Sequence, residues 1–224
     1  MFKNKVVGWL MALTLAFFMI IGPSFVTIGS PGPLVYTVTV EGTVTAGTAN
    51  YIERGLELAE RDNAKAVVIL LNTPGGLVSA TLDIIQDMSA SKIPVITYVS
   101  PEGGIAASAG TFILLNGHVA AMSPGTTCGA AMPVTMSVSG DTPQAADQKT
   151  INFLAGHMES IAQERGRPTD IARKFVLENL SLNYSEAQKA GVVDLVASDI
   201  NELLDKIDGQ EVAVKGGVVA LATS

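Results

Sequence analysis

The sequence predicts an α/β domain built around a parallel β-sheet. Two continuously apolar runs, Ala66–Leu71 and Pro94–Val99, are typical of strands that are covered on both faces. Segments with apolar residues at helical spacing lie before, between and after these runs. Strands that alternate with helices join into parallel βαβ units with right-handed crossovers. Ligands of such sheets bind at the carboxyl ends of the strands, so the loops that follow the strands are where we expect functional residues.

The elements of the first half follow this alternation. Leu34–Val40 alternates β-branched residues and predicts a strand, whereas Ile52, Leu56 and Ala59 recur at the spacing of a helix. Proline and glycine end the Ala66–Leu71 strand. The remaining predictions are a loop over Asn72–Gly76, a helix over Leu77–Ser89, a turn over Ser100–Gly104, a small-residue-rich helix over Ile105–Leu115 and a strand over Val119–Met122.

The second half is predicted to be mainly helical. Ser185–Gln188 has the spacing of a capping box for a short helix that ends at Gly191. Loops are expected over Ser123–Pro133 and, because it is polar and holds glycine and proline, over Ser137–Gln148. The other predicted elements are helices over Lys149–Arg165 and Thr169–Leu180, a strand over Val192–Val196, a helix over Asn201–Ile207 and a hairpin over Glu211–Leu221.

The composition excludes several classes of protein. The 224 residues carry a net charge of −7, and the pI near 4.8 is opposite to the basic footprint of a nucleic-acid-binding protein. The lone cysteine, Cys128, cannot form an internal disulfide or a cysteine-based zinc site. His118 and His157 lie far apart without metal-ligand spacing. We therefore expect no nucleic-acid partner, no metal and no cofactor.

The first residues have the pattern of a targeting segment. Lys3 and Lys5 precede the uncharged run Val6–Ile21, which spans about 24 Å as a helix, slightly less than the roughly 30 Å of a membrane core. We predict that residues 1–30 form a hydrophobic helix, either a cleaved export signal or a retained membrane anchor. Residues 31–224 would then form one domain. The preceding lysines stay in the cytoplasm by the positive-inside rule, which places that domain outside the membrane.

Two small-residue segments could supply catalytic groups. The turn that contains Gly75 and Gly76 could expose backbone N–H groups that stabilise an oxyanion, although an ordinary tight turn explains it equally well. Ser108 lies among alanines and glycines at the start of a predicted helix, where the helix dipole favours developing negative charge. Packing between helices is an equally good explanation of this segment.

A nucleophilic serine needs a base. Neither histidine is convincing, since His118 lies at the lip of a strand and His157 within a helix where we expect it to be solvated. A lysine that is desolvated can act instead, because burial disfavours its charged form. Lys149 is the candidate, since it opens a helix and has no carboxylate three or four residues further on. A solvated surface lysine is the alternative.

Taken together, these residues resemble the membrane-bound serine proteases of the NfeD type, a branch of the ClpP/crotonase superfamily. The resemblance runs from about Val35 to Gly209, and the order and spacing of four motifs make it specific. These motifs are Leu71–Gly76, Ala106–Thr111, Met122–Ala130 and Ser185–Asp194.

The resemblance implies a ClpP/crotonase-like fold of repeated ββα/βαβ units and a serine–lysine dyad. Ser108 matches the nucleophile of the family and Lys149 its lysine. Backbone N–H groups of Gly75 or Gly76, with that of Ala109, would form the oxyanion hole. ClpP itself uses a histidine in the loop that corresponds to Ser123–Pro133, which holds none here. The family also implies apolar segments of membrane-associated proteins as substrates, stomatin-like proteins as partners, and a homo-oligomer.

Three other functions remain open at this stage. An acyl-CoA hydratase or isomerase of the same superfamily would share the oxyanion geometry, but it would use a cytosolic cofactor and leave the serine and lysine without a role. A signal-peptide-peptidase-type protease would use the same two residue types. A catalytically inactive scaffold that assembles membrane partners would use neither.

Overall fold

A five-stranded parallel sheet forms the centre of the domain, as predicted. The computed structural model describes residues 32–136 and 143–224, of which Pro33–Ser224 form one compact unit. Every neighbouring pair of strands in the sheet is parallel. The strand order is β1 (Val35–Glu41), β2 (Ala66–Asn72), β3 (Val95–Val99), β5 (Val119–Met122) and β10 (Leu195–Val196).

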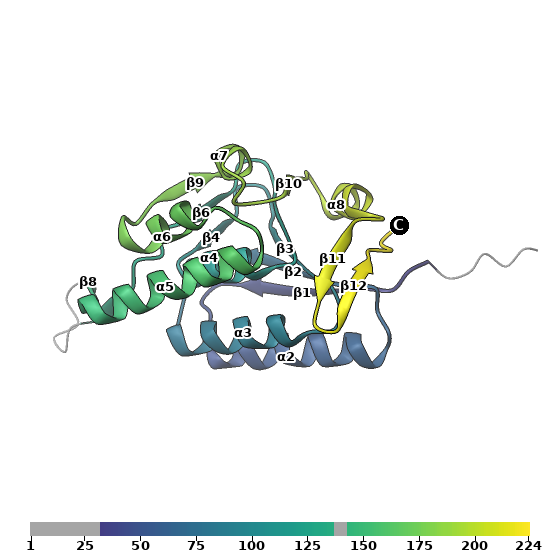
Figure 1. Ribbon diagram of the computed structural model, residues 1–224, viewed down its shortest axis with the longest axis horizontal. Coiled ribbons are helices and arrows are strands. Elements are labelled where there is room, and N and C mark those ends of the chain that lie inside the picture. Colours follow the sequence, from purple (N-terminus) through teal and green to yellow (C-terminus); the bar gives the residue numbers. More distant parts are fainter. Residues whose placement is uncertain (1–31, 137–142) are drawn as a thin grey trace, which may run out of the picture. The chain divides into compact units, whose positions relative to one another are not determined.

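Both faces of the sheet are covered, which explains the continuously apolar strands. Along β2, Val67 and Ile69 belong to one core cluster, whereas Val68 belongs to the other. Figure 1 shows α2 and α3 side by side on one face, and α8 with the β11–β12 hairpin at the other. The elements on the first face are α2 (Ala46–Arg61), α3 (Val78–Ala90), α4 (Ala109–Asn116), α5 (Gln148–Glu164) and α6 (Thr169–Leu177), and those on the second are α8 (Ile200–Ile207), β11 (Glu211–Val214) and β12 (Gly217–Ala220).

A small second sheet stands beside the first and corrects two predictions. It consists of β4 (Ile105–Ala107), β6 (Thr127–Gly129) and β9 (Ser181–Asn183). The predicted helix over Ile105–Leu115 is therefore wrong in its first four residues, because β4 pairs in parallel with β6 and Ser108 forms the turn before α4 begins. The predicted loop over Ser123–Pro133 is wrong in part for the same reason. A further hairpin, β7 (Val134–Met136) and β8 (Pro143–Ala145), precedes α5.

The end of the domain differs from the sequence prediction in its details. Helix α7 (Tyr184–Lys189) has a capping box, but the capping residue is Asn183 rather than Ser185. Its side chain accepts hydrogen bonds from the backbone N–H groups of Ser185 and Glu186, and the Glu186 carboxylate accepts one from Asn183. Strand β10 is shorter than predicted. The first residues of the predicted strand form a turn instead, in which the backbone N–H of Val192 donates to the Ala187 carbonyl.

An ion pair between a buried guanidinium and a partly exposed carboxylate fixes this last part of the chain to the sheet. The Arg167 side chain is only 2% exposed, and its guanidinium donates to Asp194 at 2.8 Å and to the Val192 carbonyl at 3.0 Å. The same Asp194 carboxylate accepts from the backbone N–H of Ala120 in β5 at 2.7 Å. Asp194 therefore bridges the α5–α6 turn and the central sheet.

The predicted N-terminal hydrophobic helix, residues 1–30, lies outside the described residues. Within residues 32–136 and 143–224, no helix is both long and apolar enough to span a bilayer.

Candidate active site

Ser108 occupies a strained turn between a strand and a helix. It follows β4 directly and caps the N-terminus of α4, with φ 52° and ψ −114°. A non-glycine residue in such a conformation costs about 1–3 kcal/mol, which the surrounding structure must offset. The sharp strand-to-helix turn resembles the strained turn that carries the nucleophilic serine in α/β-hydrolases, which have a different fold.

Hydrogen bonds hold both sides of this turn. The backbone N–H of Ser108 donates to the Gly129 carbonyl at 2.9 Å, and its carbonyl accepts from the Thr111 N–H at 3.0 Å. Just before the serine, the N–H of Ala107 donates to the Thr73 carbonyl at 3.0 Å. The serine is thus tied to the end of β2, to β6 and to the first turn of α4.

The glycine pair lets the neighbouring chains approach closely. Gly75 has φ +116°, and a Cβ there would lie 2.6 Å from the Ser108 Cβ and 3.1 Å from its Oγ. A Cβ at Gly76 would lie 2.0 Å from the Val44 carbonyl oxygen. A side chain at either glycine would therefore clash with the neighbouring chain, and Gly75 packs directly against Ser108.

The candidate oxyanion donors differ in their hydrogen bonding. The Gly75 N–H donates to the Thr73 hydroxyl at 3.0 Å. Within the described residues the N–H groups of Gly76 and Ala109 have no acceptor. Both residues line the same pocket as Ser108. Two unpaired donors beside a serine at a helix N-terminus can stabilise a developing oxyanion.

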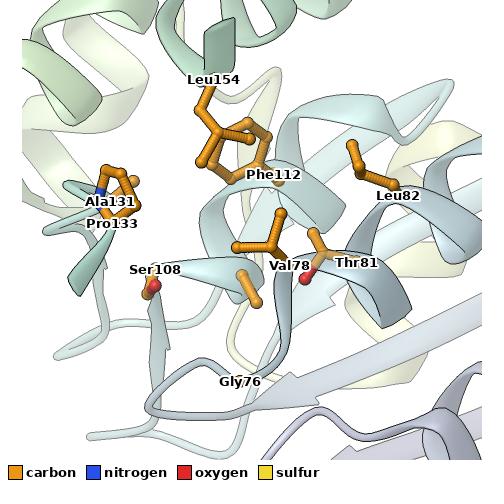
Figure 2. Close-up of a pocket in the computed structure, with 10 residues that line it drawn as sticks. Gly76, Val78, Thr81, Leu82, Ser108, Phe112, Ala131, Pro133 and Leu154 are labelled. Atoms are coloured by element: carbon orange, nitrogen blue, oxygen red, sulfur yellow. The ribbon is translucent and has the colours of Figure 1, made fainter. Parts of the chain in front are cut away.

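The pocket next to Ser108 has an apolar wall. It is bounded by α3, α4, α5 and the loop after β6, and its empty space, together with the part that opens to solvent, is about 330 Å³. Figure 2 shows Ser108 beside Ala131 and Pro133, with Leu154 of α5 above the Phe112 ring. The other side chains of the wall are Val78, Thr81 and Leu82. Such a surface is suited to an apolar side chain of a bound peptide.

Lys149 does not contact Ser108 in this structure. It lies in the first turn of α5, exposed, and is not part of the pocket wall. Leu154, which lines the pocket, is five residues further along the same helix, or about 7.5 Å along its axis. Asp147 caps this helix through the Thr150 N–H and hydroxyl, which lower the pKa of its carboxyl group. The structure therefore brings Ser108, Gly75, Gly76 and Ala109 together and leaves Lys149 outside the pocket.

The remaining titratable groups lie away from the pocket. Burial and the nearby Arg165 lower the pKa of His118 to about 4, and its Nδ1 accepts from the Val95 N–H at 3.0 Å. The prediction that His157 is solvated is wrong, because its Nε2 is buried and its ring stacks on Phe153. Burial raises the pKa of Cys128 to about 12, and its side chain packs in the core.

Three residues that position the site were not predicted as functional. Thr73 binds the glycine turn, Gly129 accepts from the serine N–H, and Thr111 bonds Gly129. Thr73, Thr111 and Gly129 belong to three of the four quoted motifs, and a threonine among small residues was a signal for a hydrogen-bonding role. The role of Gly129 depends on the pairing of β4 with β6, which no local pattern reveals.

The parallel sheet, the small second sheet and the strained serine between them belong to a domain with a ClpP-like fold. The family model described as NfeD1b, N-terminal domain, matches residues 34–216, and the chain belongs to this family. The membrane-bound protease PH1510 of Pyrococcus horikoshii is 43% identical over 190 residues, covering 84% of this chain and 43% of that protein. The membrane protein NfeD1b of Bacillus subtilis is 31% identical over 186 residues, covering 77% of this chain and 41% of that protein.

Solved structures show the same architecture. A serine-to-alanine variant of the 1510-N membrane-bound stomatin-specific protease superposes with a TM-score of 0.83 at 41% identity, covering 87% of this chain and 95% of that one. A lysine-to-alanine variant of it, in complex with a substrate peptide, has a TM-score of 0.83, 42% identity and coverages of 87% and 90%. ClpP1 of Listeria monocytogenes shares the fold at a TM-score of 0.59 and 22% identity, covering 75% of this chain and 94% of that one. The chain spans about two fifths of the length of the two curated relatives.

Proposed function

We propose that this domain is a membrane-associated serine endopeptidase with Ser108 as nucleophile and Lys149 as general base. The observation that carries the proposal is the strained turn that holds Ser108 against Gly75, with two unpaired N–H groups beside an apolar pocket. Strain of this kind persists only where the surrounding structure enforces it, and it is concentrated at functional sites.

The reaction would proceed by acyl transfer. The neutral Lys149 amine takes the proton from Ser108 as Oγ attacks the peptide carbonyl carbon, and the carbonyl electron pair moves to oxygen. The tetrahedral intermediate collapses, the C–N bond breaks, and the lysine gives its proton to the leaving amine. Water, deprotonated by the same lysine, then attacks the acyl-enzyme; the ester C–O bond breaks, the acid product leaves, and the lysine returns the proton to the Ser108 Oγ.

Gly76 and Ala109 are the better pair of oxyanion donors. Gly75 was an alternative from the sequence, but its N–H is bonded to the Thr73 hydroxyl. In this proposal Gly75 acts by the absence of a side chain, which leaves room for the serine Cβ. Removing one donor of an oxyanion hole typically costs about 10²–10³ in kcat.

Two observations support Lys149 as the base. The serine and the lysine replaced in the variants of the related protease are 41 positions apart, the same separation as Ser108 and Lys149 here. Neither histidine lines the pocket, so no imidazole competes for the role. Since Lys149 is exposed, catalysis requires that the start of α5 or its lysine side chain turn toward Ser108 when a substrate is bound.

The substrate we propose is a peptide with an apolar segment. The wall of Val78, Leu82, Phe112 and Leu154 would bind an apolar side chain next to the scissile bond. An extended peptide would pair its backbone with an exposed strand edge beside the site. Since a related protein is named as stomatin-specific, a stomatin-like membrane protein is the first partner to test.

The setting we propose is the outer side of a membrane. Residues 1–30 would serve as export signal or anchor, and residues 31–224 as the protease domain, acting as a homo-oligomer. Mass spectrometry of the mature N-terminus distinguishes the two fates of the segment. Sedimentation of the purified protein measures the number of subunits.

Peptidase assays on Ser108→Ala and Lys149→Ala proteins test the proposal. Each variant should lose at least about 10³-fold in kcat, because each removes a group that acts in the bond-breaking step. Lys189→Ala, an exposed lysine of α7, serves as the matched control and should leave kcat unchanged. Activity retained by both test variants would contradict the assignment.

One observation favours a second candidate function, an inactive scaffold. Lys149 makes no contact with Ser108, so the pair could be catalytically idle. A fluorophosphonate probe distinguishes the two functions, because a scaffold would not react while a known serine–lysine enzyme reacts in parallel.

A further inference from the structure

The hydroxyl of Thr111 forms an unusually dense set of contacts behind the active serine. Its Oγ1 lies 2.8 Å from the Ala106 carbonyl oxygen and 2.9 Å from that of Gly129, and it accepts from the Gly129 N–H at 2.9 Å. The side chain is completely buried. A buried hydroxyl bonded only to backbone groups fixes those groups relative to one another.

The groups that Thr111 holds are the ones that define the serine turn. The Gly129 carbonyl, which the hydroxyl contacts, also accepts the Ser108 N–H at 2.9 Å. The backbone N–H of Thr111 donates to the Ser108 carbonyl at 3.0 Å. Thr111 therefore binds the Ser108 carbonyl directly through its backbone N–H, and its side chain contacts the carbonyl that accepts the Ser108 N–H.

Gly129 also lies close to the residues that lead into β9. Its φ is +120°, a Cβ there would lie 2.2 Å from the Leu180 carbonyl oxygen, and the N–H of the next residue, Ala130, donates to that oxygen at 2.7 Å. The Ser108 N–H acceptor is thus fixed on one side by Leu180 and on the other by the Thr111 hydroxyl.

We propose that Thr111 is a positioning residue that holds Ser108 in its strained turn and keeps the Ala109 N–H aimed at the oxyanion. The expected change in kcat rests on the proposed peptidase function, whereas the expected change in the Ser108 turn does not. Without the hydroxyl, the Gly129 N–H loses its acceptor, and the Ala106 and Gly129 carbonyls lose the single donor that lies within reach of both, so the turn can relax toward ordinary backbone angles.

The kinetic test compares Thr111→Val, which keeps the shape, with Thr111→Ser, which keeps the hydroxyl. We expect the valine variant to lose about 10- to 100-fold in kcat with little change in KM, because a displaced nucleophile affects the transition state more than substrate binding. The serine variant should stay within about threefold of the wild type. Thr97→Val is the matched control, since Thr97 is equally buried and donates to the Leu114 carbonyl of the same helix, far from Ser108.

The control distinguishes positioning from general loss of stability. If the Thr97 and Thr111 valine variants lose activity equally, or if the Thr111 variant stays within about twofold of the wild type, the proposal is wrong. A crystal structure of Thr111→Val tests it independently of activity. A Ser108 φ that returns to negative values supports the proposal, and an unchanged turn contradicts it. If the wild-type protein cleaves no peptide, by contrast, that result would contradict only the proposed peptidase function.

Discussion

Placing a methyl group at Gly75 tests the contact between the glycine turn and the serine. In Gly75→Ala the new Cβ would lie 2.6 Å from the Ser108 Cβ and 3.3 Å from the Ala107 carbonyl oxygen. Carbon atoms in contact lie about 3.5–4.0 Å apart, so the two chains must separate by about 1 Å. A misplacement of 1 Å at a reacting group can cost about 10²-fold in rate. We therefore expect kcat to fall by about 100-fold.

The matched control for this variant is Gly42→Ala. Gly42 has φ +77° but nothing within 4 Å of a Cβ, so alanine there imposes the backbone strain of a positive φ without a clash. That strain costs about 1–2 kcal/mol of stability and should leave kcat unchanged. The assay measures peptide cleavage and the rate of serine labelling for both variants. If Gly75→Ala keeps its kcat within about threefold, the close packing of the glycine turn on the serine has no catalytic consequence.

Three further predictions concern stability. The folded protein lowers the pKa of His118 from 6.5 to about 4, so the unfolded chain binds a proton there more readily. The free energy of unfolding should therefore be highest above pH 6.5 and fall by up to about 3 kcal/mol as the pH drops toward 4. His118→Asn, whose amide oxygen can still accept from Val95, should show a smaller difference between chemical denaturation at pH 7 and at pH 4.5. An equal difference would contradict this. Asp194→Ala removes a carboxylate that is 46% exposed but accepts from the buried guanidinium of Arg167 and from the Ala120 N–H, and should cost about 2 kcal/mol in urea unfolding; a loss below about 0.5 kcal/mol would refute the bridging role. Gly156→Ala, within α5 and with open space at the Cβ, should stabilise the protein by about 0.5–1 kcal/mol in the same experiment, and a decrease would show that the helix is not formed there.

The central sheet could be predicted because its signal is local. Ala66–Leu71 and Pro94–Val99 are apolar at every position, which only strands covered on both faces require. The structure confirms both strands as β2 and β3. The β11–β12 hairpin was predicted equally well, since glycines interrupt two apolar alternating segments.

The errors arose where long-range pairing decides the local structure. Ile105–Ala107 consists of small and aliphatic residues that suit a helix, yet its backbone pairs with β6 and bridges to Thr73. Two capping signals overlap before α7, and only the hydrogen bonds show that Asn183 rather than Ser185 is the cap.

The candidate site could be predicted in its composition but not in its geometry. Motif spacing identified Ser108 and the glycine pair, and the structure places them in contact. The positive φ of Ser108 could not be predicted, because serine rarely adopts it without external support. The occupied N–H of Gly75 was also unpredictable, since it depends on how the Thr73 side chain is turned.

The most direct test of the central claim is intact-mass detection of a fluorophosphonate adduct on the full-length protein. In that reaction the serine oxygen bonds to phosphorus and fluoride leaves, so one adduct forms for each reactive serine. We predict a single adduct on Ser108 in the wild-type protein, and labelling at least about 100-fold slower in Lys149→Ala, because the base is gone. Lys189→Ala should label at the wild-type rate. An adduct on another residue, or equal labelling of Lys149→Ala and wild type, would contradict the serine–lysine dyad.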